Sequence, residues 1–154
     1  MKNKISETSF LANTLAEKAG RELIAPGLYT TGYANQDVTL LPDLLDFLDA
    51  HLVDIRFAPT VGSQIQWRKD YLRLLLKDRY RHIPHLGNRL AQESGKSSIQ
   101  NLALGIKIII ERRANLLLMC ECRKIEQCHR AVISHSLEQQ GFETQEITDW
   151  SSRK

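Results

Sequence analysis

The three cysteines of the chain lie close together in the sequence, and two further residues with useful chemistry follow the last of them. Cys120 ends an apolar run, and Cys128 is followed directly by His129 and Arg130. A thiol in the first turn of a helix lies near free backbone N–H groups and the positive end of the helix dipole, and both favour the thiolate. We therefore predict Cys128, His129 and Cys120 as catalytic residues and Arg130 as an anion-binding residue. In the alternative, Cys128 packs as a small apolar residue and His129 only fills the turn.

The same segment could hold a metal ion instead. Cys120 and Cys122 share one strand face if the strand extends that far, and Cys128 with His129 would complete a tetrahedral set. Structural zinc sites, however, usually take ligands in pairs that lie about two to four residues apart. Because Cys-x-Cys followed by adjacent Cys-His does not fit that pattern, we predict no metal ion. No G-x-G-x-x-G sequence follows the first predicted strand, and we predict no cofactor.

A charged pair, Asp54 and Arg56, lies on one face of a predicted strand whose other face is apolar. Charges near the end of a buried strand are costly unless they are satisfied. Two compatible interpretations satisfy them: a mutual salt bridge that anchors the loop at Pro59, and an anion that Arg56 binds while Asp54 orients it or a neighbouring loop. Both interpretations place the pair at the end of its strand.

Predicted strands and helices alternate along most of the chain. Leu116 to Cys120 is apolar without alternation, which is typical of a central parallel strand covered on both faces. The pattern predicts an α/β fold, a single doubly wound and mostly parallel sheet of about five strands with helices on both faces. We expect a helical extension at 1–24 and the α/β domain at 25–154. The predicted strands are 28–31, 52–57, 79–83, 116–120 and 142–147, and the predicted helices are 6–20, 40–48, 67–77, about 99–113 (capped by Ser97 or Ser98) and 127–140.

In such sheets, ligands bind beyond the carboxyl ends of the strands. The polar residues that follow the predicted strands should therefore line one depression, although they are far apart in the sequence. We predict the following substrate-binding residues: Gly32, Tyr33, Asn35, Asp54, Arg56, His82 and Arg130.

The composition is that of an ordinary folded protein, with 42% hydrophobic and 25% charged residues among 154 and a net charge of +3. No apolar run approaches the ~20 residues that a membrane span requires, so we expect no membrane association. The start of the chain lacks the apolar stretch of a signal peptide. Clustered cysteines, odd in number, are unlike a disulfide framework, and they indicate a reducing compartment, the cytoplasm.

Positive charge is concentrated between residues 68 and 89 and interleaved there with aromatic residues. Arginines and lysines outnumber acidic residues in this stretch, and Trp67, Tyr71 and Tyr80 lie among or beside them. Such a pattern can bind phosphates and stacked bases of a nucleic acid. It is also typical of a solvated helix face with its aromatic residues turned inward, which the modest net charge favours.

In order, these motifs resemble those of the uncharacterised bacterial and archaeal family called domain of unknown function 488. The resemblance covers roughly residues 28–147, and its most specific part is the Cys-His-Arg sequence after an apolar strand. It implies a small α/β protein with the motifs gathered at one edge of the sheet, without implying a reaction. The chain has Tyr33 where the family usually has histidine, and Cys122 where it usually has glutamate. The matching segments are Leu28 to Asn35, Val53 to Arg56 with Pro59, His82 to Gly87, and Leu116 to Cys120 leading to Cys128-His129-Arg130.

From these residues we expect an enzyme that acts on an anionic small molecule at the carboxyl edge of the sheet. A phosphate-bearing molecule such as a nucleotide or nucleoside would suit Arg56 and Arg130. The alternative is a non-catalytic protein that binds a nucleotide or nucleic acid with the same pocket and the basic 68–89 face. The sequence does not indicate whether the protein is a monomer or an oligomer.

Overall fold

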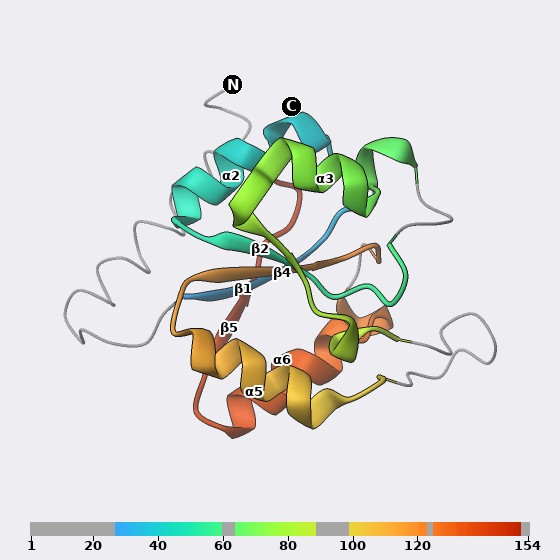
Figure 1. The fold of residues 1–154 in the computed structure, drawn as a ribbon. Helices are drawn as coiled ribbons and strands as arrows, with labels where there is room; N and C mark the ends of the chain where they lie inside the picture. Colours follow the sequence, from blue (N-terminus) through green and yellow to red (C-terminus); the bar gives the residue numbers. More distant parts are fainter. Residues whose placement is uncertain (1–26, 60–63, 89–98, 123–124, 152–154) are drawn as a thin grey trace.

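Five parallel strands form one sheet in the computed structural model (Figure 1), which describes residues 27–59, 64–88, 99–122 and 125–151. The predicted fold class, a single parallel α/β sheet with helices, is confirmed. The predicted extension at 1–24 lies outside the described residues. Across the sheet the order is β3 (Tyr80–His82), β2 (His51–Asp54), β4 (Leu116–Cys120), β1 (Leu28–Gly32) and β5 (Thr144–Glu146).

Helices cover both faces of the sheet. Figure 1 shows one pair on one face and a second pair on the other. The first pair is α2 (Leu41–Leu48) and α3 (Lys69–Leu76), and the second is α5 (Leu102–Arg112) and α6 (Arg130–Gln139). Within the described residues, no helix combines the length and the apolar character that crossing a membrane would require.

The central strand β4 is buried on both faces, as its uninterrupted apolar sequence predicts. It pairs with β1 on one side and with β2 on the other. Leu117 and Met119 pack into the core under α2 and α3, whereas Leu116 and Leu118 pack into the core over α5 and α6. Because Cys120 belongs to the second core, its thiol points to the face where α6 begins.

Helix α5 begins later than its periodicity predicts. Ile99 lies in an isolated bridge with Asn88, and the helix starts at Leu102. Its N-cap is Asn101, whose side chain accepts a hydrogen bond from the backbone N–H of Leu104 at 3.2 Å. The prediction of a cap at residue 97 or 98 is therefore wrong, because apolar spacing continues through the bridge and hides the boundary.

Strand register brings the candidate residues to one edge of the sheet. Gly32 at the end of β1 pairs with Cys120, and Asp54 at the end of β2 pairs with His82 of β3. Backbone pairing between β1 and β4 continues beyond the last residue of β1, because the N–H of Tyr33 donates to the carbonyl of Cys120 at 2.9 Å. The loops at the carboxyl edge of the sheet therefore begin from hydrogen-bonded backbone.

Candidate functional site

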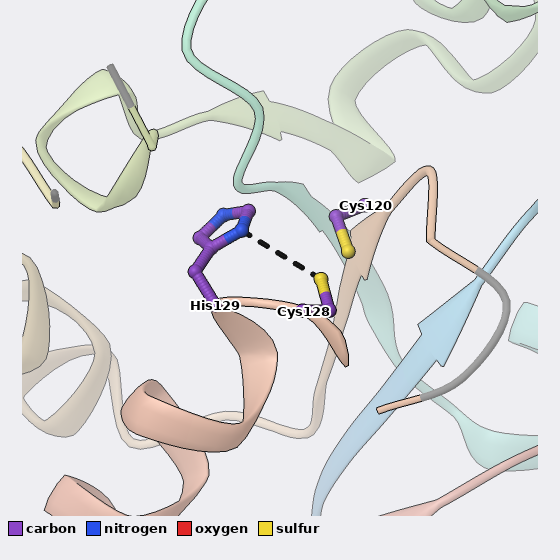
Figure 2. Close-up of side chains that lie close together, drawn as sticks. All are labelled: Cys120, Cys128 and His129. Atoms are coloured by element: carbon purple, nitrogen blue, oxygen red, sulfur yellow. Dashed lines mark hydrogen bonds between the residues drawn. The ribbon is translucent and has the colours of Figure 1, made fainter. Parts of the chain in front are cut away.

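Two sulfur atoms and an imidazole meet where β4 ends and α6 begins. The ligand atoms of Cys120, Cys128 and His129 all lie within 4.8 Å of one another, and all three residues are buried. The Sγ of Cys128 is 3.6 Å from Nδ1 of His129, and Figure 2 shows the three side chains turned toward a common point. All three cysteines of the chain are free thiols.

Cys122 is the third thiol of this cluster and its only half-buried one, since Cys120 and Cys128 are buried. Hydrogen bonds with both of these neighbours lower the pKa of the Cys122 thiol. Burial raises the pKa of Cys120. A hydrogen bond with Cys120 lowers the pKa of Cys128. The hydrogen bond of Cys128 with Cys122 and the burial of Cys128 have the opposite and larger effect, so the pKa of Cys128 is raised. The three thiols therefore titrate as a coupled set and not as independent groups.

The imidazole of His129 is oriented by the backbone of the neighbouring strand. Its Nε2 donates a hydrogen bond to the carbonyl of Ile55 at 2.9 Å. Since a neutral imidazole carries one proton, Nδ1 then has a free lone pair, and this atom faces Cys128. Burial lowers the pKa of His129, which keeps the ring neutral near pH 7.

Arg130 is completely buried directly beneath the thiols. Its Nη1 donates to the Sγ of Cys120 at 3.1 Å and to the carbonyl of Cys122 at 2.6 Å, and Nη2 pairs with Glu146 at 2.7 Å. Burial alone would lower the pKa of Arg130, but the charges of Cys120 and Glu146 raise it. The positive charge of Arg130 is therefore shared between a carboxylate and the thiol cluster.

Gly32 makes room for the loop that carries Cys122. A Cβ atom at Gly32 would lie 1.6 Å from the carbonyl oxygen of Cys122 and 2.7 Å from Nη1 of Arg130. Any side chain would thus displace the backbone beside the thiols. The structure gives Gly32 a packing role within the site.

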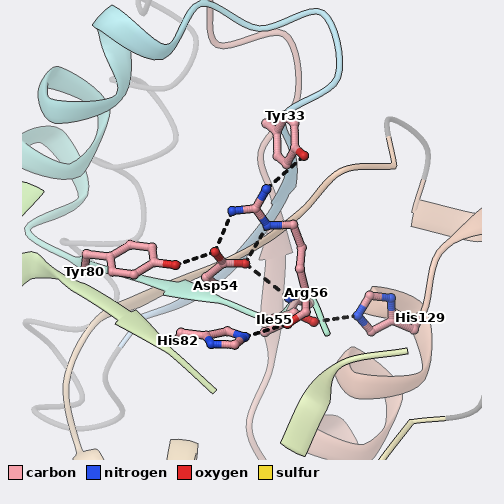
Figure 3. A network of polar contacts seen from close by, with 7 residues as sticks. All are labelled: Tyr33, Asp54, Ile55, Arg56, Tyr80, His82 and His129. Atoms are coloured by element: carbon pink, nitrogen blue, oxygen red, sulfur yellow. Dashed lines mark hydrogen bonds and ion pairs between the residues drawn. The ribbon is translucent and has the colours of Figure 1, made fainter. Parts of the chain in front are cut away.

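Arg56 lies in a second buried network, shown in Figure 3, rather than in a free anion site. Its Nε and Nη2 donate to the two carboxylate oxygens of Asp54 at 2.8 and 2.6 Å, and its Nη1 donates to the hydroxyl of Tyr33 at 3.0 Å. Burial would lower the pKa of Arg56, but the hydrogen bonds and charge of Asp54 outweigh it and raise it. The mutual salt bridge that the sequence predicts for this pair is present.

Aromatic residues complete this second network. The hydroxyl of Tyr80 donates to Asp54 at 2.5 Å, and burial followed by the charge of Asp54 raises the pKa of Tyr80. The ring of Tyr33 stacks on Trp67 with a centroid separation of 4.3 Å. Trp67 and Tyr80 thus face inward, whereas Tyr71, the third aromatic residue of the basic face, is exposed.

The two networks meet through the backbone at the end of β2. The carbonyl of Ile55 accepts from His129, and the carbonyl of Arg56 accepts from Nε2 of His82 at 2.7 Å (Figure 3). Burial lowers the pKa of His82. His82 and His129 are each held by a backbone carbonyl at the end of β2, whereas Asn35 lies in an exposed turn with a positive φ of 69°.

A cavity of about 350 Å³ opens at this edge, and Cys122 is not among the residues that line it. It shares Gly32 and Glu146 with the surroundings of Arg130. Its lining includes three carboxylates and neither arginine nor lysine among the described residues: Gly32, Gln36, Ile125, Glu126, Glu146, Ile147, Thr148 and Asp149.

Three members of the site are absent from the sequence-based set: Cys122, Tyr80 and Glu146. The sequence indicates Cys122 as a candidate metal ligand and as a departure from the family pattern, although Cys-x-Cys spacing also places it close to Cys120. The charge pattern places Tyr80 on the basic face. Nothing in the sequence links Glu146 to Arg130, because that pairing depends on β5 lying next to β1.

Comparisons with protein-family models, with curated proteins and with solved structures give no match to the chain. The resemblance to the domain of unknown function 488 family therefore stays a prediction from the sequence motifs.

Proposed function

We propose that the protein is an enzyme in which the thiol of Cys122 attacks an electrophilic small molecule at the carboxyl edge of the sheet. The observation that carries the proposal is the position of Cys122. It is the half-buried thiol of a three-cysteine cluster, and Ile125 and Glu126, which follow it closely in the chain, line the cavity at this edge. Cys120 and Cys128 have the same chemistry but are covered by protein.

The surroundings of Cys122 suit a nucleophile. The guanidinium of Arg130 holds the backbone of Cys122 in place and lies next to the cluster. The N-terminus of α6 adds the positive end of a helix dipole, and a nearby positive charge stabilises a thiolate. His129 offers an unprotonated nitrogen to Cys128, through which the cluster can give up a proton.

The substrate that fits this edge is neutral or positively charged. The anionic substrate expected from the sequence depended on Arg56 and Arg130, and both guanidinium groups are paired with buried or half-buried carboxylates. The lining of the cavity adds Glu126 and Asp149. An anion entering it would meet carboxylates of the same charge.

Alkylation of the reduced, metal-free protein tests the nucleophile. With iodoacetamide at neutral pH, Cys122 is expected to react at least about tenfold faster than Cys120 and Cys128, because a buried thiol must first be exposed by local opening and each ~1.4 kcal/mol of opening costs a factor of ten. Peptide mass spectrometry of the time course gives the three rates. In Cys122→Ser, the fast phase is expected to disappear. A fast phase at Cys120 or Cys128 instead would refute the assignment.

The same assay with iodoacetate tests the substrate charge, since iodoacetate differs from iodoacetamide mainly by its carboxylate. The ratio of the iodoacetamide rate to the iodoacetate rate at Cys122 is expected to exceed the ratio for glutathione, used as a free thiol. A preference for iodoacetate would restore the anionic substrate class and contradict this part of the proposal.

A further inference from the structure

We infer that Cys120, Cys128 and His129 bind one divalent metal ion of the zinc class, with two thiolate sulfurs and Nδ1 of the imidazole as its ligands. The inference reverses the sequence-based expectation of no metal. It goes beyond the proposed function, because Cys122 is not one of these three ligands. Once Nδ1 of His129 binds the ion it no longer accepts a proton, so the proton acceptor of the proposed function is present only in the metal-free protein.

The distances match a tetrahedral ion. Zinc lies about 2.3 Å from sulfur and 2.0–2.1 Å from nitrogen, so tetrahedral angles put the sulfur and nitrogen about 3.6 Å apart and two sulfurs about 3.8 Å apart. The Sγ of Cys128 and Nδ1 of His129 are 3.6 Å apart, and all three ligand atoms lie within 4.8 Å of one another. Small side-chain rotations would therefore bring the three atoms onto one ion.

The orientation of His129 is that of a metal ligand. Histidines that bind metals almost always donate their second ring N–H to a carbonyl or carboxylate, which sets the tautomer and aims the lone pair. In this chain Nε2 donates to the carbonyl of Ile55 at 2.9 Å, and Nδ1 faces the thiols (Figures 2 and 3). This contact comes from β2, a different part of the fold, and is independent of the clustering of the cysteines.

The charges nearby are compatible with two bound thiolates. A divalent cation neutralises both thiolates, and burial then carries no uncompensated negative charge. Nη1 of Arg130 donates to the Sγ of Cys120, a contact that holds this ligand in place, while Glu146 balances the arginine. The soft sulfur ligands favour zinc over magnesium or calcium, which prefer oxygen.

The ligand spacing also has a physical explanation. Ligand pairs separated by two to four residues suit short loops, whereas here Cys120 is supplied by the end of a central strand and Cys128 and His129 by the turn before α6. Two cysteines and one histidine leave the fourth tetrahedral position to water or substrate, as in catalytic zinc sites.

Cobalt binding tests the inference, because Co²⁺ replaces zinc and reports its ligands by visible absorption. The reduced full-length chain, freed of metal with a chelator, is titrated with Co²⁺ and then with Zn²⁺. We expect one Co²⁺ per chain with a thiolate charge-transfer band and intense tetrahedral bands, followed by displacement by Zn²⁺. His129→Gln and Cys128→Ala are each expected to weaken binding by more than about 100-fold, the upper end of the cost of losing an outer-shell contact.

His135→Gln is the matched control. It removes an exposed histidine of α6 that contacts none of the three ligands, so it is expected to bind Co²⁺ like the parent. Circular dichroism checks that each variant is folded. If Cys128→Ala does not fold, the result is decided by His129→Gln alone. Absence of a charge-transfer band, or unchanged binding by His129→Gln, would overturn the inference. The alkylation rate of Cys122 is measured in a separate experiment on the metal-free protein, so either proposal can fail while the other holds.

Discussion

The variant Leu117→Asp is expected not to fold. Leu117 is fully buried in the central strand, where its backbone lies between Tyr29 of β1 and Leu52 of β2. An aspartate there would bury a carboxylate among apolar side chains without a partner, at a cost of several kcal/mol. That cost is comparable with the whole stability of a domain of this size, about 5–15 kcal/mol.

Circular dichroism and thermal melting of purified Leu117→Asp measure this effect. Leu74→Asp is the matched control, because Leu74 on α3 is 79% exposed and the same substitution there should change the stability by about 0.5 kcal/mol or less. A soluble Leu117→Asp protein that melts cooperatively near the temperature of the parent would show that β4 is not the centre of the sheet.

Asp54→Ala is expected to lower the free energy of unfolding by about 3–5 kcal/mol, because it leaves the guanidinium of Arg56 buried without its carboxylate. Tyr80 loses its acceptor at the same time. Denaturant unfolding gives the value. The control is Asp46→Ala, since Asp46 forms its salt bridge with Arg79 at the surface and such pairs contribute up to about 1 kcal/mol.

A double variant separates the lost pair from the stranded charge. Asp54→Leu combined with Arg56→Leu removes both charges, and is expected to be more stable than Asp54→Ala because no charge remains buried alone. If the double variant were less stable than the single variant, the penalty would come from lost packing and not from an unpaired guanidinium.

The sheet could be predicted from the sequence because it depends on local patterns. The uniform apolar run at Leu116 to Cys120 identifies a strand covered on both sides, and alternation of strands with helices predicts parallel pairing. The start of α5 could not be located in this way. The apolar spacing runs on through Ile99, while the cap at Asn101 depends on one side-chain hydrogen bond.

The candidate site was predictable as a location but not as a charge distribution. The loops after the strands do come together, because parallel strands end at one edge. Whether an arginine at that edge is free depends on carboxylates that other strands bring to it. Arg130 meets Glu146 only through the pairing of β1 with β5, which no local pattern encodes.

The central place of β4 also governs the order in which the protein can be assembled during synthesis. β1 and β2 are made first, yet they are not neighbours in the finished sheet, and the gap between them is filled by residues 116–120. Until that segment has left the ribosome, both strands expose unpaired edges, and their later pairing closes long loops, which slows folding and invites association with other chains. Cys120 ends the strand that joins β1 to β2, and Cys122 and Cys128 follow it, so the thiols can become buried and oriented only after β4 has been inserted between the two strands.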